Sequence, residues 1–180
     1  NGRSYYPTIS GNGAFVYFAS WADNLVPGES LTGVNLYVKE LATGRITLIN
    51  RDKDGFPADL AVSFAGTTAY EHMAATYSRR YLFFHDRFDN YITGDTNGNH
   101  DIYCIDLDPD LDGDLMQGNT VIRRVSLGPG GAQGVGGLIT TGGSLRPTCT
   151  ADGLEIAFDT SHTNLFSGDT NGDVRDAVVA

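Results

Sequence analysis

Short apolar segments alternate with polar turns along the whole chain, and one pattern of segments occurs three times. The three copies align without a gap: residues 8–28, 74–94 and 148–168. The second copy lies 66 residues after the first, and the third lies 74 residues after the second. Three residue types fall in register in all copies: Phe18, Phe84 and Phe158; Asn24, Asn90 and Asn164; Gly28, Gly94 and Gly168. Such repetition is typical of folds in which one unit buries its apolar faces against copies of itself.

Each copy predicts two strands joined by a tight turn. The first strand is expected at residues 6–10, 73–76 and 147–150. The second is expected at residues 14–18, 80–84 and 154–158. In the first and third copies the turn contains Asn12-Gly13 or Asp152-Gly153, and such pairs are strong hairpin signals. Because aromatic and β-branched residues fill the second strand, we expect neighbours on both of its faces.

Two further strands complete the unit. A third strand is expected at residues 35–41, 101–107 and 175–180, and a fourth at residues 45–50 and 121–127. The sequence therefore predicts an all-β, β-propeller-like fold with four-stranded antiparallel blades, about two full blades and a partial third. Since closed propellers have about 4–8 blades, we expect a piece of a larger ring or a ring completed by other chains. A strand donated by another chain would cover the bare edge of the third blade.

The same pattern divides the chain into one module with two insertions. The expected parts are blade 1 at about 4–50, a linker at 51–72, blade 2 at about 73–127, a Gly-rich linker at 128–143 and partial blade 3 at about 144–180. The Gly-rich linker fits neither G-x-G-x-x-G nor the GK[ST] of a P-loop. It is expected to be a flexible surface loop.

Several quoted segments resemble one known family. They are SYYPTIS, FVYFAS and DNLVPG in the first copy, GDTNG and DIY in the second, and SLRP and GDTNG in the third. They are similar to the TolB-like β-propeller repeats of exported bacterial proteins, over nearly the whole chain apart from the two insertions. The resemblance implies a secreted, periplasmic or cell-surface setting, and it brings no catalytic signature.

Composition narrows the range of partners. The formal net charge is -10, which disfavours nucleic acid and anionic membrane surfaces. No apolar run approaches the roughly 18 residues that span a bilayer, so no membrane span is expected. The acidic surplus suits divalent cations or simply keeps a secreted protein soluble. Cys104 and Cys149 are expected to be buried free thiols, with one bridge between repeats as the alternative.

The strongest candidate for chemistry is an acidic run after the third strand of blade 2. Its aspartates are Asp108, Asp110, Asp112 and Asp114, and with Gly113 they fit the D-x-D-x-D-G opening of a calcium loop. The twelfth position is Asn119 rather than Glu, and no flanking helices are evident, so the prediction is an isolated calcium loop on a hairpin. The alternative is a solvated acidic hairpin tip held by Asx turns.

A second candidate is the connector that contains Asp-Thr-Asn-Gly. Its oxygen-bearing residues are Asp95, Asn97, Asn99 and Asp101 in the second copy, and Asp169, Asn171, Asp173 and, one residue late, Asp176 in the third. Alternating oxygen ligands suit calcium. The same side chains can instead staple a loop to its own backbone, and we favour that interpretation because Glu29-Ser30-Leu31-Thr32-Gly33 of the first copy lacks the Asn-Gly pair.

Catalytic patterns are weak. The four histidines His72, His85, His100 and His162 form no H-x-H or H-x-x-x-H pair, and there is no G-x-S-x-G. Paired carboxylates of the glycosidase type stay open, and Trp21 is a candidate to stack on a sugar, with packing against the blade as its default role.

The sequence thus favours a non-catalytic, exported binding or scaffold module stabilised by calcium, with a protein or carbohydrate ligand. One alternative is the propeller fragment of a larger hydrolase or lyase. Another is an extracellular structural subunit that self-associates through its incomplete third blade.

Overall fold

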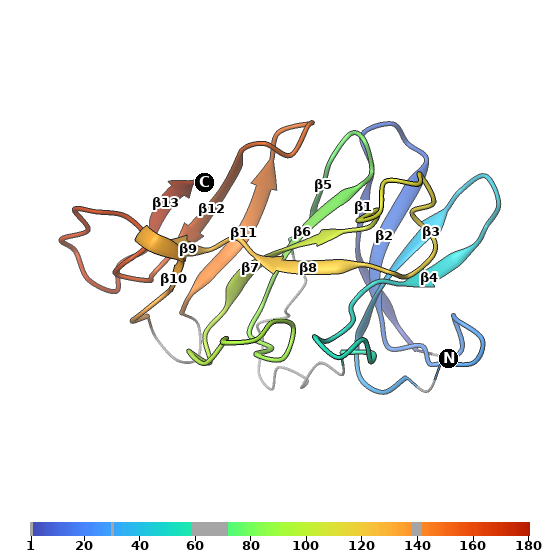
Figure 1. Cartoon of the computed structure of the whole chain (residues 1–180), viewed down its shortest axis with the longest axis horizontal. Helices are drawn as coiled ribbons and strands as arrows, with labels where there is room; N and C mark the ends of the chain where they lie inside the picture. The colour runs from blue at the N-terminus through green and yellow to red at the C-terminus, as the bar shows by residue number, and fades with distance from the viewer. Residues whose placement is uncertain (1, 30, 59–71, 138–141) are drawn as a thin grey trace.

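The computed structural model describes residues 2–29, 31–58, 72–137 and 142–180 of the chain. Three antiparallel sheets lie side by side in chain order, and the colour gradient in Figure 1 passes from blue through green to red as it crosses them. Besides strands, the described residues contain one short 3-10 turn, η1 (Pro129–Gly131), and no α-helix. None of their helices is long and apolar enough to cross a membrane.

The first sheet, blade 1, has four strands in chain order. They are β1 (Ser4–Ile9), β2 (Phe15–Ser20), β3 (Asn35–Glu40) and β4 (Ile46–Leu48). The pairing of β1 with β2 shifts register between Tyr5 and Thr8, and Tyr6 has a left-handed φ of 48° just before a proline. The bulge lets β1 start at Ser4, two residues earlier than the sequence pattern indicates.

Blade 2 repeats this order. Its strands are β5 (Ala74–Ala75), β6 (Tyr81–Asp86), β7 (Asp101–Asp106) and β8 (Val121–Arg124). Blade 3 has three strands, β11 (Ser144–Cys149), β12 (Ile156–Thr160) and β13 (Asp176–Val179). Its first strand carries the same bulge as β1, with Arg146 at a φ of 55°. The predicted fold class, an all-β propeller-like array of two full blades and a partial third, is confirmed.

Two apolar cores join the blades, and adjacent residues of β6 contribute to different cores. Phe84 packs with Tyr17 and Val38 of blade 1 in the larger core. Phe83 packs with Ile156 and Phe158 of blade 3 in the smaller one. Because neighbouring side chains of a strand point to opposite faces, blade 2 is covered on both sides, as the run of apolar residues predicts.

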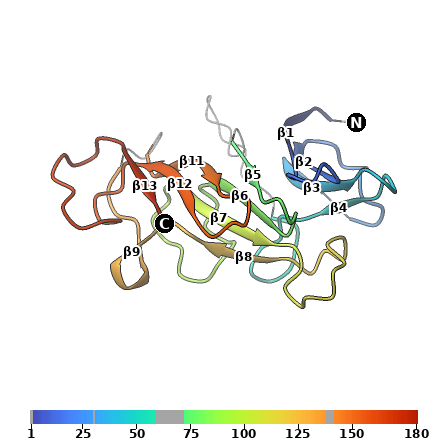
Figure 2. The same ribbon diagram turned by 90° about the horizontal axis from the view of Figure 1, so that it is seen from above.

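The outer faces of the two end blades differ. On blade 1, Tyr37 and Leu48 are fully buried under Leu31 and side chains from the connector that follows β2. On blade 3 the face opposite to Phe158 and Val178 is open, with a shallow groove at Thr148, Ala157 and Val179. Seen from above, β13 lies beside β12, and the C-terminal end of the chain lies close to both (Figure 2). Blade 3 therefore has neither a fourth strand nor a covering layer among the described residues.

The described part of the Gly-rich segment, residues 128–137, pairs with itself and with its neighbours, which differs from the flexible surface loop that its composition predicts. It forms β9 (Leu127–Gly128) and β10 (Ala132–Gln133), which pair with each other around η1. The segment then runs between the polar connectors of blades 2 and 3 and bonds to both. Glycine is needed where the packing is tightest, because a Cβ on Gly134 would lie 2.1 Å from the His162 ring. Composition alone does not reveal such contacts, which reach residues 37 and 31 positions away.

The shared asparagine of the repeat has a clear structural role in blades 2 and 3. Asn164 donates to the Gln133 carbonyl and accepts from the Val135 amide, at 3.0 and 2.8 Å. Asn90 donates to Asp52 at 3.1 Å. Each asparagine thus ties its connector to the segment that links its blade to the preceding one. The linker expected at 51–72 lies largely outside the described residues.

Candidate functional site

The acidic run after β7 brings three of its four aspartates together. Ligand atoms of Asp108, Asp110 and Asp112 all lie within 4.8 Å of one another, and this is the one such group of His, Cys, Asp or Glu in the described part of the chain. Asp108 is buried, whereas the other two are exposed. Asp114 lies apart from them, since its carboxylate accepts from the Met116 amide at 2.9 Å and faces Arg45 at 3.8 Å.

The acidic run also shapes itself through its own side chains. Asp108 accepts a bond from the Gly113 amide at 3.3 Å, and Asp112 accepts from the Asp114 amide at 2.9 Å. Asn119, at the position where an EF-hand has Glu, donates to Asp110 at 3.0 Å. Leu111 and Gly113 adopt left-handed φ values of 63° and 87°, which turn the backbone twice within four residues. The spacing therefore produces both Asx turns and a cluster of carboxylates, so the two interpretations of the sequence are not exclusive.

This acidic loop is anchored on blade 1. The Met116 carbonyl accepts hydrogen bonds from Arg45 at 2.8 Å and Thr47 at 3.0 Å. The Thr120 hydroxyl donates to the Ile49 carbonyl at 3.1 Å. The side chains of Leu115 and Met116 enter the larger core. Interactions that fix the conformation of the acidic loop therefore also strengthen the contact between blades 1 and 2.

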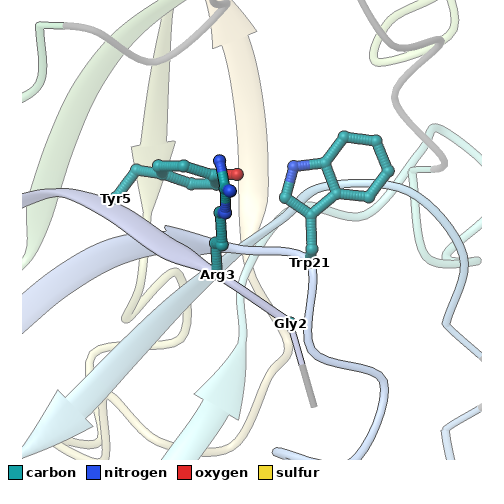
Figure 3. A pocket seen from close by; sticks show the side chains of 4 residues that line it. All are labelled: Gly2, Arg3, Tyr5 and Trp21. Carbon is teal, nitrogen blue, oxygen red and sulfur yellow. The ribbon is translucent and has the colours of Figure 1, made fainter.

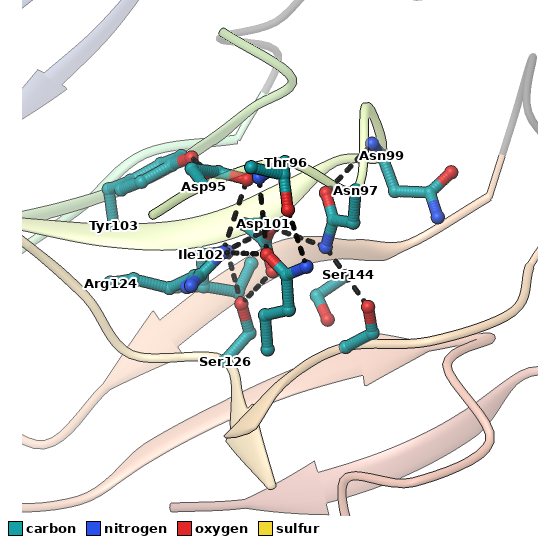
Figure 4. A network of polar contacts seen from close by, with 12 residues as sticks. Asp95, Thr96, Asn97, Asn99, Asp101, Ile102, Tyr103, Arg124, Ser126 and Ser144 are labelled. Carbon is teal, nitrogen blue, oxygen red and sulfur yellow. Dashed lines mark hydrogen bonds and ion pairs between the residues drawn. The ribbon is translucent and has the colours of Figure 1, made fainter. Parts of the chain in front are cut away.

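The Asp-Thr-Asn-Gly connector of blade 2 surrounds a buried guanidinium (Figure 4). Arg124 of β8 lies 3.2 Å from Asp95 and 3.4 Å from Asp101, and its side chain is 7% exposed. The Ser126 hydroxyl donates to Asp101 at 2.5 Å and accepts from the Ile102 amide at 3.0 Å. Burial raises the pKa of Asp101 to about 6. The positive charge inside this connector thus comes from the chain itself.

The two asparagines of the same connector bond to backbone groups and to one carboxylate. Asn97 donates to Asp101 at 3.0 Å and to the Gly134 carbonyl at 3.1 Å. The Asn97 side chain also accepts from the Asn99 amide at 3.0 Å, and Asn99 donates to the Gly136 carbonyl at 2.9 Å. These contacts agree with the stapled-turn interpretation that the sequence favours, and the calcium prediction for this connector stays a prediction.

In the corresponding connector of blade 3 the guanidinium of Arg175 pairs with Asp159 of β12 at 2.8 Å, outside the connector. Asp169 accepts from the Asn171 amide at 3.1 Å, and Asn171 donates to Asp176 at 3.2 Å. Asp173 accepts from the Gly137 amide at 2.7 Å. The second oxygen of Asp169 is buried without a hydrogen-bond partner in the described part of the chain. No described Lys or Arg forms an ion pair with these three carboxylates.

Three histidines are buried at the junction of blades 2 and 3, which the sequence does not indicate. The rings of His85 and His100 lie 5.5 Å apart, and His162 lies 3.3 Å from the Ser144 hydroxyl. Burial lowers the pKa of His85 to about 3 and those of His100 and His162 to about 4. One ring nitrogen of each has no hydrogen-bond partner among the described residues. The burial of His85 could have been inferred from the strand pattern, because His85 lies two residues after Phe83 and the two side chains face the same side of β6.

Trp21 lies beside an open hollow at the chain start rather than in a core. Gly2, Arg3, Tyr5 and Trp21 line it, and Trp21 is 39% exposed (Figure 3). Cys104 and Cys149 are free thiols, as the sequence predicts, but both are half-buried rather than buried.

The sequence matches no protein-family model and no curated protein. Among solved structures it is similar to TolB from Acinetobacter baumannii, at 14% identity and a TM-score of 0.40, over 99% of this chain and 41% of that chain. It is also similar to hydrazine synthase from Kuenenia stuttgartiensis, at 16% identity and a TM-score of 0.44, over 100% of this chain and 45% of that chain. The chain therefore spans less than half the length of these two structures.

Proposed function

We propose that this chain is an exported, non-catalytic binding or scaffold module of propeller type that calcium stabilises at the acidic loop. The observation that carries the calcium proposal is the cluster of Asp108, Asp110 and Asp112, whose ligand atoms lie within 4.8 Å. Calcium takes six to eight oxygen ligands in flexible geometry, and carboxylates on alternate residues of one loop suit it. An ion there would offset the repulsion among the carboxylates.

The anchoring of the acidic loop supports a structural role for such an ion. Because Met116 and Thr120 bond to blade 1, a loop fixed by calcium would hold blades 1 and 2 in a constant relation. The connectors of the blades would then be presented as one rigid surface, which suits a binding or scaffold module. The resemblance of the repeats to those of exported proteins supports the proposal of export, and an acidic composition suits it.

Thermal unfolding in EDTA and in millimolar calcium tests the proposal. A ligand at about 100 times its Kd adds about 2.7 kcal/mol to the free energy of unfolding, and each kcal/mol is worth about 2–4 °C in a chain of this size. The variant with Asp110→Asn and Asp112→Asn is expected to lose the shift. The variant with Asp54→Asn and Glu155→Gln removes two exposed charges elsewhere and is expected to keep it. An equal midpoint with and without calcium in the wild type would contradict the proposal.

A further inference from the structure

The same trio of positions recurs in every blade. It comprises the residue two places before Thr8, Ala74 or Thr148, the last residue but one of the second strand, and the residue just before the third strand. Its members are Tyr6, Ala19 and Val34 in blade 1, His72, His85 and His100 in blade 2, and Arg146, Asp159 and Arg175 in blade 3. The strand pairing shows the equivalence, because these parts of the first three strands pair in the same register in all three blades.

In blades 3 and 1 the members of this trio meet. The two carboxylate oxygens of Asp159 accept hydrogen bonds from Arg146 at 2.7 Å and from Arg175 at 2.8 Å. In blade 1 all three members belong to the larger core or pack against it. The fold therefore brings the side chains of the trio together, and the sequence of each blade decides their chemistry.

Blade 2 places an imidazole at each of the three positions. The rings of His85 and His100 have centres 5.5 Å apart, and the two residues are 4% and 3% exposed. The Nδ1 atom of each ring is buried without a hydrogen-bond partner in the described part of the chain. Buried polar atoms nearly always have a partner, so two orphaned nitrogens side by side call for a ligand. Two imidazoles on one tetrahedral zinc, with bonds of about 2.0–2.1 Å, have their ring centres about 5 Å apart.

His72 supplies the third imidazole. It occupies the position from which Arg146 reaches Asp159 in blade 3. Burial, followed by the charges of His100 and His72, lowers the pKa of His85 to about 3, so His72 lies within electrostatic reach of His85. The nitrogens of the three rings do not all lie within 4.8 Å of one another. Because His72 is exposed, its side chain can turn toward the other two by a change of rotamer.

We propose that His72, His85 and His100 bind one divalent ion of the late first transition row, with Zn²⁺ as the expected one. Neutral imidazole is the form that binds such ions, and burial keeps His85 and His100 neutral at pH 7. Three imidazoles leave the fourth position of a tetrahedral ion to water. The ion would tie together the first three strands of blade 2 at the end that contacts Gly143 and Ser144 of blade 3.

This site is separate from the acidic loop in place and in chemistry. His100 precedes β7 and the acidic loop follows it, so the two sites lie at opposite ends of that strand. Nitrogen ligands suit zinc, copper and nickel, whereas carboxylates on a loop suit calcium. Three arginines near the histidines oppose a cation, and Asp159 offsets two of them through its ion pairs; the three are Arg87, Arg146 and Arg175.

Zinc titrated into the full chain tests the proposal, with calorimetry as the readout. The chain is first freed of metal with EDTA and then dialysed into millimolar calcium, so that calcium competes for the acidic loop. The wild type is expected to bind one zinc ion per chain, and His72→Gln or His85→Gln is expected to weaken that binding at least about tenfold. His162→Gln is the matched control, because His162 is also buried at this junction but lies outside the trio, and it is expected to bind zinc as the wild type does.

Further variants separate this result from folding and from the calcium proposal. His72 is exposed, so His72→Gln is expected to keep the urea midpoint of the wild type in EDTA. The variant with Asp110→Asn and Asp112→Asn is expected to bind zinc normally. An absent calcium effect on melting therefore leaves this inference intact, and absent zinc binding leaves the calcium proposal intact. In EDTA the rings carry no ion, and the pKa values of His85 and His100 then govern their effect on stability.

Co²⁺ in place of zinc reports the geometry of the site. Three nitrogens and one water are expected to give the intense visible absorption of a four-coordinate ion, which His85→Gln loses. The inference is overturned if the wild type binds no zinc, or if bound Co²⁺ has the weak spectrum of a six-coordinate ion. It is also overturned if His72→Gln or His85→Gln binds zinc as well as the wild type, or if Asp110→Asn with Asp112→Asn abolishes the binding.

Discussion

At the scale of single residues, the clearest feature is that blade 2 carries its own cation. Asp95 and Asp101 are both buried, and Arg124 lies between them with a side chain that is 7% exposed. Two carboxylates in a low-dielectric site cannot both stay ionised without a positive partner. The guanidinium therefore sets the charge state of the connector and holds it against β8.

Arg124→Leu is expected to destabilise the fold by about 3–5 kcal/mol, because it leaves buried carboxylates without their partner. Urea denaturation at pH 7.5 measures the loss. The matched control is Arg123→Leu, whose side chain is 64% exposed and whose effect is expected to stay below about 0.5 kcal/mol. Since the pKa of Asp101 is already raised to about 6, the cost of Arg124→Leu is expected to shrink at pH 5. Equal losses for the two variants would contradict the assignment.

The limits of sequence reasoning at this scale follow from distance along the chain. The alternation of Asp108, Asp110 and Asp112 is local, so a pattern of seven residues is enough to predict that they gather. Arg124 is separated from Asp95 by a whole strand and the acidic loop, and no spacing rule links them. Nor does the sequence indicate that Asp114 turns toward Arg45, because that contact depends on how blade 1 packs.

At the scale of elements, the repeat predicts the strands well and the connectors poorly. Strand order and the antiparallel pairing follow from hydrophobic alternation and turn residues. The first strands of blades 1 and 3, β1 and β11, begin earlier than expected because each contains a bulge. The fourth strands are shorter than expected, at 3 and 4 residues. Residues 128–137 of the Gly-rich segment differ from the prediction, since two neighbouring connectors hydrogen-bond to them and composition does not reveal these contacts.

Gly134→Ala tests whether the Gly-rich segment packs tightly against blade 3. A Cβ there would lie 2.1 Å from the His162 ring, which overpacks the site and is expected to cost about 1–3 kcal/mol in the free energy of unfolding. Ala132→Val, on the exposed side of the same segment, is the matched control and is expected to be nearly neutral. Chemical denaturation compares the two. If Gly134→Ala left the free energy of unfolding unchanged, the segment would be able to move away from the His162 ring without cost.

At the scale of the whole molecule, buried titratable groups give the junction between blades 2 and 3 a dependence on pH. The pKa values of His85, His100 and His162 are lowered by burial, so the unfolded chain takes up their protons first as the pH falls. Their contribution to stability is complete above about pH 6.5 and is lost toward the folded pKa values. Asp86 and Asp101 act in the opposite sense, because burial raises their pKa values to about 7 and about 6.

A comparison with His85→Gln isolates one of these groups. Relative to this variant, the wild type is expected to lose about 1.4 kcal/mol for each pH unit below 6.5, down to about pH 4. Urea midpoints at pH 7, 5.5 and 4.5 measure the difference, and the opposing aspartates cancel from it. His72→Gln, at the surface, is expected to follow the wild-type profile. A constant difference between the wild type and His85→Gln would rule out the assignment of the low pKa.

The placement of Phe83 and Phe84 on adjacent positions of β6 has a consequence for how the molecule comes apart. Strand β6 supplies one aromatic ring to each of the two cores. If blade 1 or blade 3 unfolded, one face of blade 2 would therefore lose its apolar contacts. A state in which only one face of blade 2 stays covered would expose apolar surface to water and would be high in free energy. The three repeats are therefore expected to unfold as a single cooperative unit, although each is recognisable on its own in the sequence.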